Sequence, residues 1–493
     1  MNLVSAFARS VDQNAAKTAL FWGDSVYSYR DFAAQSAGLA RKLQQAFHVQ
    51  PGDRVGIWLK NCPEFVSALF GILNAGAVVV PINNFLKPQE VEYILRDAGI
   101  RVLVTEASMG DALAQLASGL PELRFIHTTD FGGPEKSAVA PELSCARKRE
   151  DLAVIIYTSG TTGRPKGAML THGNLLHNVE SCRQVLEAVS FDRFVVLLPM
   201  FHSFMLCVGI LLPLLVGGSI VLIKSVHPPK NILQEIIQHE ATILPAIPQL
   251  FRALANAPVP PNVPLRLCVS GAAPLPREIQ KEFNAKFPVP LIEGYGLSEA
   301  SPVVSLNPIH GPWKTGSIGK PIPDVEVCVQ NDAGERLPDG EVGEICVRGG
   351  NVMAGYWNQP EETAKALRNS WLLTGDLGYR DADGYFYITD RKKDMLLVNG
   401  INVYPREIEE VIYQFPGIKE AAVVGVPDPR KGEQPIAFAV ADDGAAPDEK
   451  ALLQFVRGKL ADYKVPRKVV FLPSLPRNAT GKILKTALRQ MPI

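Results

Sequence analysis

The chain has little cysteine, no excess of either charge and no internal repeat or low-complexity tract. Its 493 residues include only 7 cysteines, and none form a C-x-x-C pair, which argues against a zinc site. Scattered cysteines favour reduced, mostly buried thiols, as in a cytoplasmic protein. Lys plus Arg and Asp plus Glu both count 50, so no basic excess points to nucleic acid. A hydrophobic fraction of 47% with 20% charged residues excludes a disordered chain.

Neither the N-terminus nor the long apolar runs predict a membrane-spanning protein. The start, MNLVSAFARSVDQ, lacks the basic and apolar regions of a signal peptide. The run 194–223 is long enough to span a bilayer, but Pro213 and Gly217–Gly218 divide it into a helix and a strand over 219–223. The run 65–82 has the same design, which is typical of an α/β core. We expect both runs to be buried, while peripheral membrane contact and the oligomeric state, monomer or homodimer, stay open.

Alternating apolar strands and helical patterns predict an α/β fold of stacked layers. The expected strands include residues 53–59, 101–104, 241–244 and 265–269. Between about residues 315 and 389 the pattern changes to short strands, such as 325–329 and 343–347, separated by glycine-containing turns. This change predicts an antiparallel β subdomain.

A compact charge cluster, DRKKD at 390–394, marks the clearest domain boundary. The length of the chain by itself predicts two to four domains. We predict a large N-terminal domain over residues 1–389, a hinge at 390–394 and a small α+β C-terminal domain over 395–493. An amphipathic helix is expected at 407–415.

The segment 157–167, YTSGTTGRPKG, carries most of the chemical information. It follows the apolar run 152–157, which predicts a buried strand of a parallel sheet. Glycines can take positive φ and let backbone N–H groups turn towards an anion, while hydroxyls and a lysine add donors for phosphate. The segment is therefore predicted to bind a polyphosphate. Its candidate ligands are Thr158, Ser159, Gly160, Thr161, Thr162, Gly163 and Lys166.

The spacing of this loop differs from a Walker A loop, G-x-x-x-x-G-K-[ST]. Lys166 comes three residues after Gly163, directly behind Pro165, and is followed by Gly167 instead of a hydroxyl residue. This spacing disfavours a P-loop kinase or motor ATPase.

Five further motifs follow the loop in order. They are SGAAP at 270–274, EGYGLSE at 293–299, TGD at 374–376, DRKKD at 390–394 and PRNATGKI at 476–483. Taken singly, Glu299, Asp376 or Lys482 would more often be a surface or turn residue. As an ordered set covering essentially the whole chain, the motifs resemble those of the adenylate-forming superfamily. That superfamily contains acyl-CoA and aryl-CoA synthetases, peptide-synthetase adenylation domains and firefly luciferase.

The resemblance implies which residues bind ATP and AMP. Tyr295 matches the tyrosine that stacks on adenine, Asp376 the carboxylate that accepts the ribose hydroxyls, and Arg391 a nucleotide-contacting arginine. Glu299, helped by Thr158, would bind Mg²⁺. Beyond the phosphate loop, the implied nucleotide site comprises Gly271, Ala272, Ala273, Glu293, Gly294, Tyr295, Gly296, Ser298, Asp376, Arg391 and Lys482.

The resemblance also implies two half-reactions with ATP and CoA as co-substrates. A carboxylate would attack the α-phosphate of ATP, helped by Mg²⁺ and by Lys482, which would stabilise the charge that grows in the transition state. The implied catalytic residues are Lys482, Glu299 and His202. The acyl-adenylate is destroyed by water, so the site should close.

For the second half-reaction the small domain would turn about its hinge, at Asp390 and Lys393. That movement would bring a pantetheine tunnel to the adenylate, and the CoA thiol would then form the thioester. The implied tunnel residues are Val398, Asn399 and Gly400. Some members of the superfamily carry a lysine where this chain has Leu397. The function of that lysine is therefore not carried over to this chain.

The implied acyl pocket comprises His202, Phe204, Gly296 and Leu297. A histidine in an apolar segment is more often a satisfied core residue, but the superfamily places an aromatic or histidine gate here. Amino-acid-activating members have an aspartate soon after the position of Phe201. Here no carboxylate follows, and a buried ammonium without a counter-charge would be costly.

The stretch DRKKDMLLVNGINVYPREIEEVI, residues 390–412, is most similar to fatty-acyl-CoA ligases. We therefore predict an ATP-dependent carboxylate–CoA ligase that acts on a fatty acid. The alternatives are an aryl-CoA ligase, a stand-alone adenylating enzyme that loads a carrier protein or stops at the adenylate, and a catalytically idle nucleotide- or acyl-binding relative.

Overall fold

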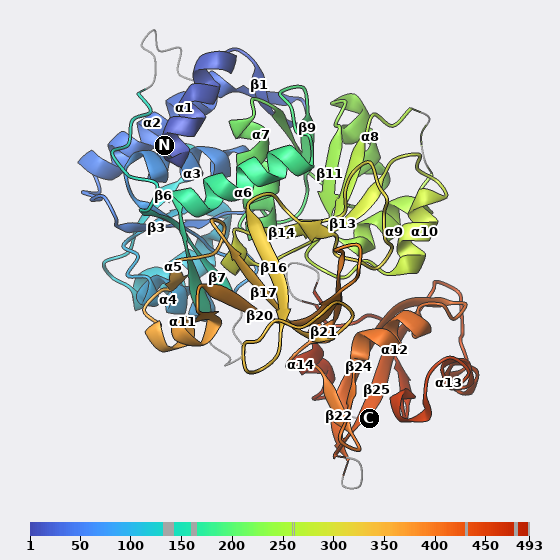
Figure 1. Cartoon of the computed structure of the whole chain (residues 1–493). Coiled ribbons are helices and arrows are strands. Elements are labelled where there is room, and N and C mark those ends of the chain that lie inside the picture. Colours follow the sequence, from blue (N-terminus) through green and yellow to red (C-terminus); the bar gives the residue numbers. More distant parts are fainter. Residues whose placement is uncertain are drawn as a thin grey trace.

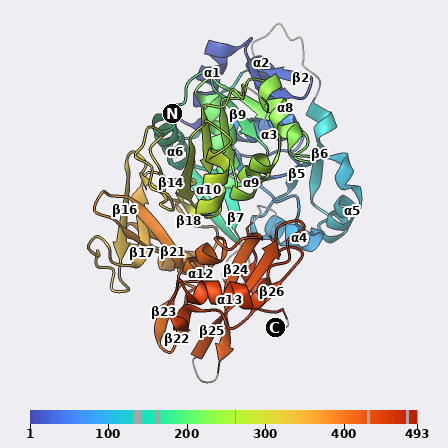
Figure 2. The ribbon, with the colours of Figure 1, turned by 90° about the vertical axis from the view of Figure 1, so that its right-hand side faces the viewer.

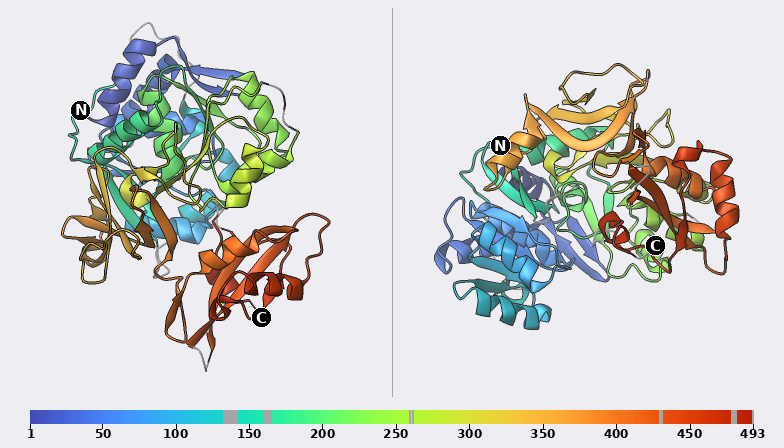
Figure 3. Two further views of the ribbon diagram at one scale, coloured as in Figure 1. Left: turned by 45° about the vertical axis from the view of Figure 1, so that its right-hand side comes forward. Right: turned by 90° about the horizontal axis from the view of Figure 1, so that it is seen from below.

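The computed structural model describes residues 1–131, 142–158, 165–258, 260, 262–428, 432–477 and 482–491. Within these residues the strands form two large sheets, a smaller antiparallel sheet and a fourth sheet near the C-terminus (Figure 1). Helices cover the large sheets, so the predicted α/β class is confirmed. In Figures 2 and 3 the fourth sheet lies at one end of the molecule, beyond the other three.

The first large sheet is parallel in its centre and antiparallel at both ends. From one edge to the other its strands are β15 (Lys320–Pro321), β14 (Val303–Leu306), β13 (Leu291–Gly296), β12 (Leu267–Ser270), β11 (Ile243–Ala246), β9 (Arg193–Val196), β10 (Ser219–Leu222), β1 (Thr18–Trp22) and β2 (Ser25–Ser28).

The second large sheet contains the strand before the predicted phosphate loop. Its order is β18 (Gly355–Tyr356), β8 (Lys166–Thr171), β7 (Leu152–Thr158), β4 (Val78–Pro81), β3 (Arg54–Trp58), β5 (Val102–Thr105) and β6 (Arg124–His127). As predicted, β7 is buried and pairs in parallel with β4. Its other neighbour, β8, is antiparallel, and the predicted loop lies between these two strands in the sequence.

The central hydrophobic core lies between the two large sheets. Side chains alternate along each strand, so in β4 Val79 joins this core, whereas Val78 and Val80 join the core on the outer face. The helices of the central core are α1 (Leu3–Asn14), α2 (Tyr29–Gln45), α3 (Pro63–Asn74), α6 (His172–Val185) and α7 (Leu212–Leu215). The outer faces are covered by α4 (Pro88–Asp97) and α5 (Gly110–Gly119) on one side and by α8 (Lys230–Gln238), α9 (Pro248–Asn256) and α10 (Arg277–Asn284) on the other.

The two long apolar runs are buried in this core, as predicted. The run 65–82 forms most of α3 and then β4. The run 194–223 differs in detail, because it begins in β9 and its helix is π-helical over Met205–Leu211 before α7 and β10. Pro213 lies in the first turn of α7, where a missing N–H costs little, and so does not end the helix.

No helix in the described part of the chain is long and apolar enough to cross a membrane. All seven cysteines lie in that part, and all are free. The cytoplasmic location predicted from the cysteine pattern stays a prediction.

The third sheet confirms the antiparallel strands predicted at 325–329 and 343–347. It consists of β16 (Val325–Gln330), β17 (Gly343–Gly349), β20 (Trp371–Arg380), β19 (Leu367–Arg368) and β21 (Phe386–Arg391). A short helix, α11 (Pro360–Ala366), connects β18 to β19. The hairpin β20–β21 carries two of the predicted nucleotide-binding residues.

The C-terminal segment has its own sheet and its own hydrophobic clusters. Adjacent residues of one strand face opposite sides: Val423 packs under the helices and Val424 on the other face. The elements are β22 (Leu396–Val398), β23 (Ile401–Val403), α12 (Pro405–Ile412), β24 (Ile418–Asp428), β25 (Gly432–Ala441), α13 (Glu449–Arg457), β26 (Val469–Phe471) and α14 (Lys485–Leu488). The helix predicted at 407–415 begins two residues earlier, because Pro405 suits a first helical turn, and it ends three residues earlier, at Ile412. The predicted domain limits and the hinge role of 390–394 stay predictions.

Candidate active site

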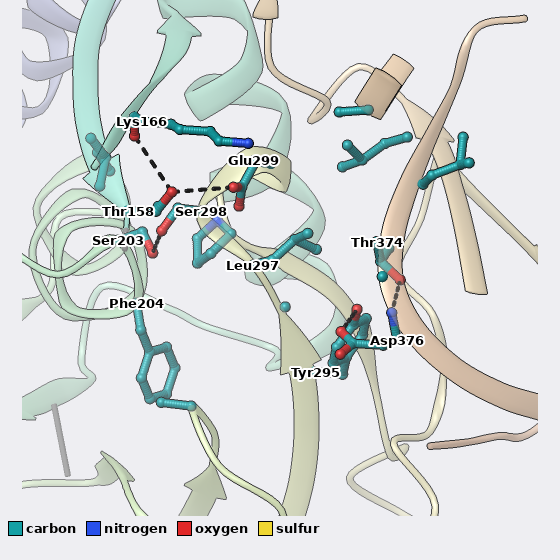
Figure 4. Close-up of a pocket in the computed structure, with 18 of the residues that line it drawn as sticks. Thr158, Lys166, Ser203, Phe204, Tyr295, Leu297, Ser298, Glu299, Thr374 and Asp376 are labelled. Carbon is teal, nitrogen blue, oxygen red and sulfur yellow. Dashed lines mark hydrogen bonds between the residues drawn. The ribbon is translucent and has the colours of Figure 1, made fainter. Parts of the chain in front are cut away.

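A cavity of about 1340 Å³ lies where the carboxyl ends of β7, β12 and β13 meet the β20–β21 hairpin and the C-terminal segment (Figure 4). Ligands of open α/β sheets typically bind at the carboxyl ends of the strands. The cavity brings together most of the residues predicted for the site. Those that line it are Thr158, Lys166, His202, Phe204, Gly271, Ala272, Gly294, Tyr295, Gly296, Leu297, Ser298, Glu299, Asp376, Arg391, Lys393 and Lys482.

One end of the cavity is formed by the β7–β8 hairpin. Thr158 and Lys166 lie opposite each other in the antiparallel register, and Figure 4 shows Thr158 between Lys166 and Glu299. The Thr158 hydroxyl donates to Glu299 Oε1 over 3.4 Å. The Tyr356 hydroxyl donates to the same oxygen over 2.9 Å. The predicted ligands Ser159, Gly160, Thr161, Thr162 and Gly163 lie outside the described residues.

The β20–β21 hairpin places a carboxylate beside a guanidinium. The register pairs Asp376 directly with Arg391, and Asp376 Oδ1 lies 3.3 Å from Arg391 Nε. The Tyr295 hydroxyl donates to Asp376 Oδ2 over 2.6 Å. Although Asp376 is only 5% exposed, it lines the cavity, so its carboxylate can accept hydrogen bonds from vicinal hydroxyls.

A third part of the cavity is apolar and contains His202. Burial and the charge of Lys482 lower the pKa of His202 to about 4, so its imidazole is neutral at pH 7. Close by, the hydroxyls of Ser203 and Ser298 are hydrogen-bonded at 2.9 Å. A Cβ atom at Gly296 would lie 2.2 Å from the carbonyl oxygen of Pro302, so this wall of the cavity requires glycine.

Lys482 comes from the C-terminal segment and reaches the same cavity. Burial and the nearby Arg391 lower its pKa to about 8, and the charge of Asp376 opposes that shift. A partly buried ammonium is thus held between the Asp376 side of the cavity and the His202 side. Such a charge interacts strongly with an anion because little water screens it.

Comparison with known proteins gives a consistent picture. The family model described as "AMP-binding enzyme" matches residues 7–357, and that of the "AMP-binding enzyme C-terminal domain" matches residues 407–482. This chain belongs to the AMP-binding enzyme family. The adenylate-forming resemblance seen in its motifs is therefore confirmed.

Relatives of this AMP-binding enzyme are similar over nearly their whole length. A long-chain-fatty-acid–CoA ligase of Bacillus subtilis (strain 168) is 37% identical, with 96% of this chain and 91% of the relative covered. A feruloyl-CoA synthase of Amycolatopsis sp. is 38% identical, with 96% and 95% covered. Among solved structures, the anthranilate CoA ligase AuaEII in complex with anthranoyl-AMP has a TM-score of 0.92 at 31% identity, with 99% and 96% covered. ATP-bound MatB from Rhodopseudomonas palustris has a TM-score of 0.90 at 34% identity, with 99% of both chains covered.

In this AMP-binding enzyme the residues predicted for a CoA tunnel do not line the cavity. Val398 is buried in the C-terminal core, whereas Asn399 and Gly400 form the exposed turn between β22 and β23, both with positive φ. Leu397 is 49% exposed. The segment that carries Lys482 faces the cavity instead, so this arrangement fits the first half-reaction, and the tunnel stays a prediction.

Three other predicted residues are also absent from the cavity lining. Ala273 is half-buried beside it. Asp390 is buried, and its carboxylate accepts the backbone N–H of Arg406 over 3.0 Å. Glu293 is buried behind the wall, where Oε1 accepts the backbone N–H of Leu275 over 3.1 Å. Burial raises the pKa of Glu293 to about 7. Because its side chain does not line the cavity, its contact with nucleotide stays a prediction.

Among the cavity residues that the motifs do not predict, Tyr356 and Glu362 lie at the Thr158–Lys166 end. Tyr356 lies on β18, which reaches the site only because it pairs with β8. Glu362 follows on α11 and forms an ion pair with Lys166. No local pattern distinguishes these residues from an exposed strand and helix, so only the sheet pairing could have identified them.

Arg252 on α9 connects the body of the enzyme to the C-terminal sheet. Its guanidinium donates to the carbonyls of Lys419 and Ile418 and lies 3.1 Å from Asp442 Oδ1. It also pairs with Glu282 on α10 at 3.5 Å. With only 14% of the side chain exposed, these contacts hold the C-terminal sheet in the orientation that directs Lys482 into the cavity.

Arg252→Ala is therefore expected to lower the rate of adenylate formation about three- to tenfold. Thioester formation from supplied acyl-adenylate should change less than about twofold, because the C-terminal sheet leaves this orientation in the predicted second step. Asp442→Asn, which keeps the carbonyl contacts, should cause a smaller loss. Single-turnover assays of each half-reaction measure both rates; an equal loss in both would contradict the assignment.

The pH dependence of adenylate formation should follow the charge of Lys482. Because the free-enzyme pKa is about 8, the cationic form dominates below pH 8 and is lost above it. We expect kcat/KM for adenylation to be level from about pH 6.5 to 7, to be halved near pH 8 and to fall about tenfold per unit above about pH 9. In Lys482→Arg the charge persists beyond pH 12, so the decline should disappear, and its persistence would assign it to another group.

Proposed function

We propose that this enzyme activates an aliphatic carboxylic acid of fatty-acid type and transfers it to CoA. The enzyme is an AMP-forming acid–CoA ligase, with ATP and CoA as co-substrates. The observation that carries the proposal is the position of Lys482, which reaches one cavity shared with Asp376 and His202. A nucleotide whose ribose lies at Asp376 would present its α-phosphate towards this ammonium and towards a carboxylate near His202.

The side chains at this cavity have separate tasks in adenylate formation. Asp376 would accept the ribose hydroxyls, with its carboxylate fixed by Tyr295 and Arg391. Lys482 would attract the incoming carboxylate and stabilise charge that grows on the α-phosphate oxygens. Neutral His202 offers a polar contact without a competing charge. The segment from Thr158 to Lys166 would hold the pyrophosphate.

The oxygen donors at Glu299 suit Mg²⁺. Its carboxylate and the Thr158 hydroxyl lie together at the phosphate end, and among the described residues no group of three or more His, Cys, Asp or Glu could hold a metal. Mg²⁺ is usually bound by one or two carboxylates together with substrate phosphates and water, so the donor set fits. When bound, Mg²⁺ would neutralise phosphate charge and polarise the α-phosphorus.

An aliphatic acid is supported by the apolar branch of the cavity. The lining residues contributed by α6, the π-helical segment and the 302–306 segment carry no charged side chain. They are Cys182, Val185, Leu186, Val208, Pro302, Val303 and Leu306. An acyl chain placed there would bury apolar surface, worth about 0.8 kcal/mol per CH₂ group.

An aromatic acid is the second candidate, because the relatives include a feruloyl-CoA synthase and an anthranilate CoA ligase. The test is mass spectrometry of products from purified enzyme, Mg²⁺-ATP, CoA and a pool of short, medium, long-chain and aromatic acids. Fatty acyl-CoA would support the proposal, and aryl-CoA would favour the second candidate. Acyl-AMP without a thioester would indicate a carrier-protein acceptor.

The proposal also includes the residues of the hinge and of the CoA tunnel. Asp390 and Lys393 would lie at the hinge, and Val398, Asn399 and Gly400 would line the tunnel after the C-terminal sheet turns. Glycine and an asparagine with positive φ leave room for close approach of a thiol arm. Substituting Gly400 should therefore slow thioester formation more than adenylation.

A further inference from the structure

The ammonium of Lys166 is shared with a carboxylate from a distant part of the chain. Lys166 Nζ forms an ion pair with Glu362 Oε2 on α11, 196 residues away in sequence. The two side chains are 11% and 24% exposed, so water screens the pair incompletely. The Tyr356 ring also lies 5.3 Å from Nζ, within cation–π distance.

Glu362 has a second cation of its own. Its other oxygen, Oε1, lies 2.6 Å from Lys365 Nζ, one helical turn further along α11. Hydrogen bonds from Lys166 and Lys365 lower the pKa of Glu362 to about 2, so the carboxylate is charged at neutral pH. The Lys365 side chain is 68% exposed, so it can move together with the Glu362 carboxylate. Glu362 therefore keeps one ion-pair partner when the Lys166 ammonium binds elsewhere.

The position of Lys166 also allows its ammonium to bind an anion in the cavity. Its backbone lies opposite Thr158 where β7 and β8 meet, and its side chain lines the cavity. A lysine side chain carries a compact charge on a flexible stem. A polyphosphate carries more negative charge than one carboxylate and offers several acceptor oxygens to the same ammonium.

We propose that Glu362 competes with the phosphates of ATP and with pyrophosphate for Lys166, and so sets how tightly both are held. Glu362 is a positioning residue, since it acts through Lys166. Each arrival of a phosphate group displaces the carboxylate, and each departure of pyrophosphate is helped by its return. The inference rests on the proposed function, because it assigns Lys166 to the phosphates of the nucleotide.

The test measures pyrophosphate binding by isothermal titration calorimetry in Mg²⁺ buffer, with no acid and no CoA. Glu362→Gln keeps the size and the hydrogen-bonding oxygen but removes the competing charge. We expect pyrophosphate to bind about three- to tenfold more tightly to this variant. The KM for ATP should fall by a similar factor, product inhibition by pyrophosphate should strengthen, and kcat should not rise.

Two variants on the same helix control for charge and folding. Glu361→Gln removes an identical charge from the neighbouring exposed residue and should change pyrophosphate affinity less than about twofold. Lys365→Gln removes the second of the two cations paired with Glu362 and leaves Lys166, so pyrophosphate should bind about two- to threefold more weakly. This opposite change keeps the inference testable even where Glu362→Gln folds poorly.

The outcomes separate this inference from the proposed function. Unchanged or weaker pyrophosphate binding by folded Glu362→Gln, with normal binding by the unsubstituted enzyme, overturns the role of Glu362 alone. An equal gain in Glu361→Gln also overturns it, since the effect would then be one of general charge. Failure of the unsubstituted enzyme to bind either pyrophosphate or ATP overturns both.

Discussion

Replacing Lys482 with alanine is expected to slow adenylate formation by about 10³-fold. In the structure this ammonium is partly buried beside Arg391 and Asp376. It lies close enough to His202 for its charge to lower the pKa of the histidine. A cation in that position can stabilise the charge that develops when a carboxylate attacks the α-phosphate. Alanine supplies no charge, and water reaches the site too poorly to replace it.

The second half-reaction should be nearly unaffected by Lys482→Ala. Given chemically prepared acyl-adenylate and CoA, the variant should form thioester within about twofold of the normal rate, because the predicted domain movement takes Lys482 away from the adenylate. Pyrophosphate release measures the first step and liquid chromatography of acyl-CoA the second. Lys459 is an exposed lysine of the C-terminal segment that donates to Gln414, in the turns that follow α13 and α12. Lys459→Ala is the matched control and should leave both rates unchanged. Equal losses in both steps would refute the role given to Lys482.

Glu299→Gln is expected to lower adenylation by about 10²- to 10³-fold and to raise the Mg²⁺ concentration needed for half-maximal rate. Glutamine keeps the oxygen that accepts from Thr158 and Tyr356, so the local packing should persist. A neutral amide binds Mg²⁺ far more weakly than a carboxylate does. The loss should therefore come from the metal and the phosphates, with little change in thermal stability.

Tyr356→Phe is the matched control for this substitution. It removes one hydrogen bond to Glu299 Oε1 but keeps the negative charge, so the rate should fall by no more than about tenfold. Electron paramagnetic resonance of Mn²⁺, titrated into enzyme with α,β-methylene-ATP, reports metal affinity without turnover. If Glu299→Gln binds Mn²⁺ as tightly as the unsubstituted enzyme, Glu299 is not the metal ligand.

Much of the fold follows from local patterns in the chain. Apolar runs such as 78–80 and 152–157 are strands of a largely parallel sheet, where most of their residues are buried. The strand expected at 241–244 is observed at 243–246, since the pattern cannot say where pairing with a neighbour begins. The π-helical turn at 205–211 was not predicted, because its apolar residues are equally compatible with an α-helix.

The site shows the same division between residues in motifs and residues outside them. Residues at a strand's carboxyl end, such as Thr158 and Tyr295, were found because chemistry and position coincide in one motif. Glu362 and Tyr356 stand outside the motifs, since their position at the cavity depends on the pairing of β18 with β8. In the opposite sense, Glu293 belongs to a motif but points behind the cavity wall towards Arg406, 3.9 Å away.

The sequence by itself determined the α/β class, the family and which residues are predicted to bind nucleotide, because short motifs and strand patterns depend on neighbouring residues alone. Tertiary structure decided which charges meet. It placed Glu362 on Lys166, fixed Asp376 between Tyr295 and Arg391, and directed Lys482 into the cavity. Those contacts join segments far apart in the chain, and their energies depend on burial and distance, which exist only after the sheets have packed.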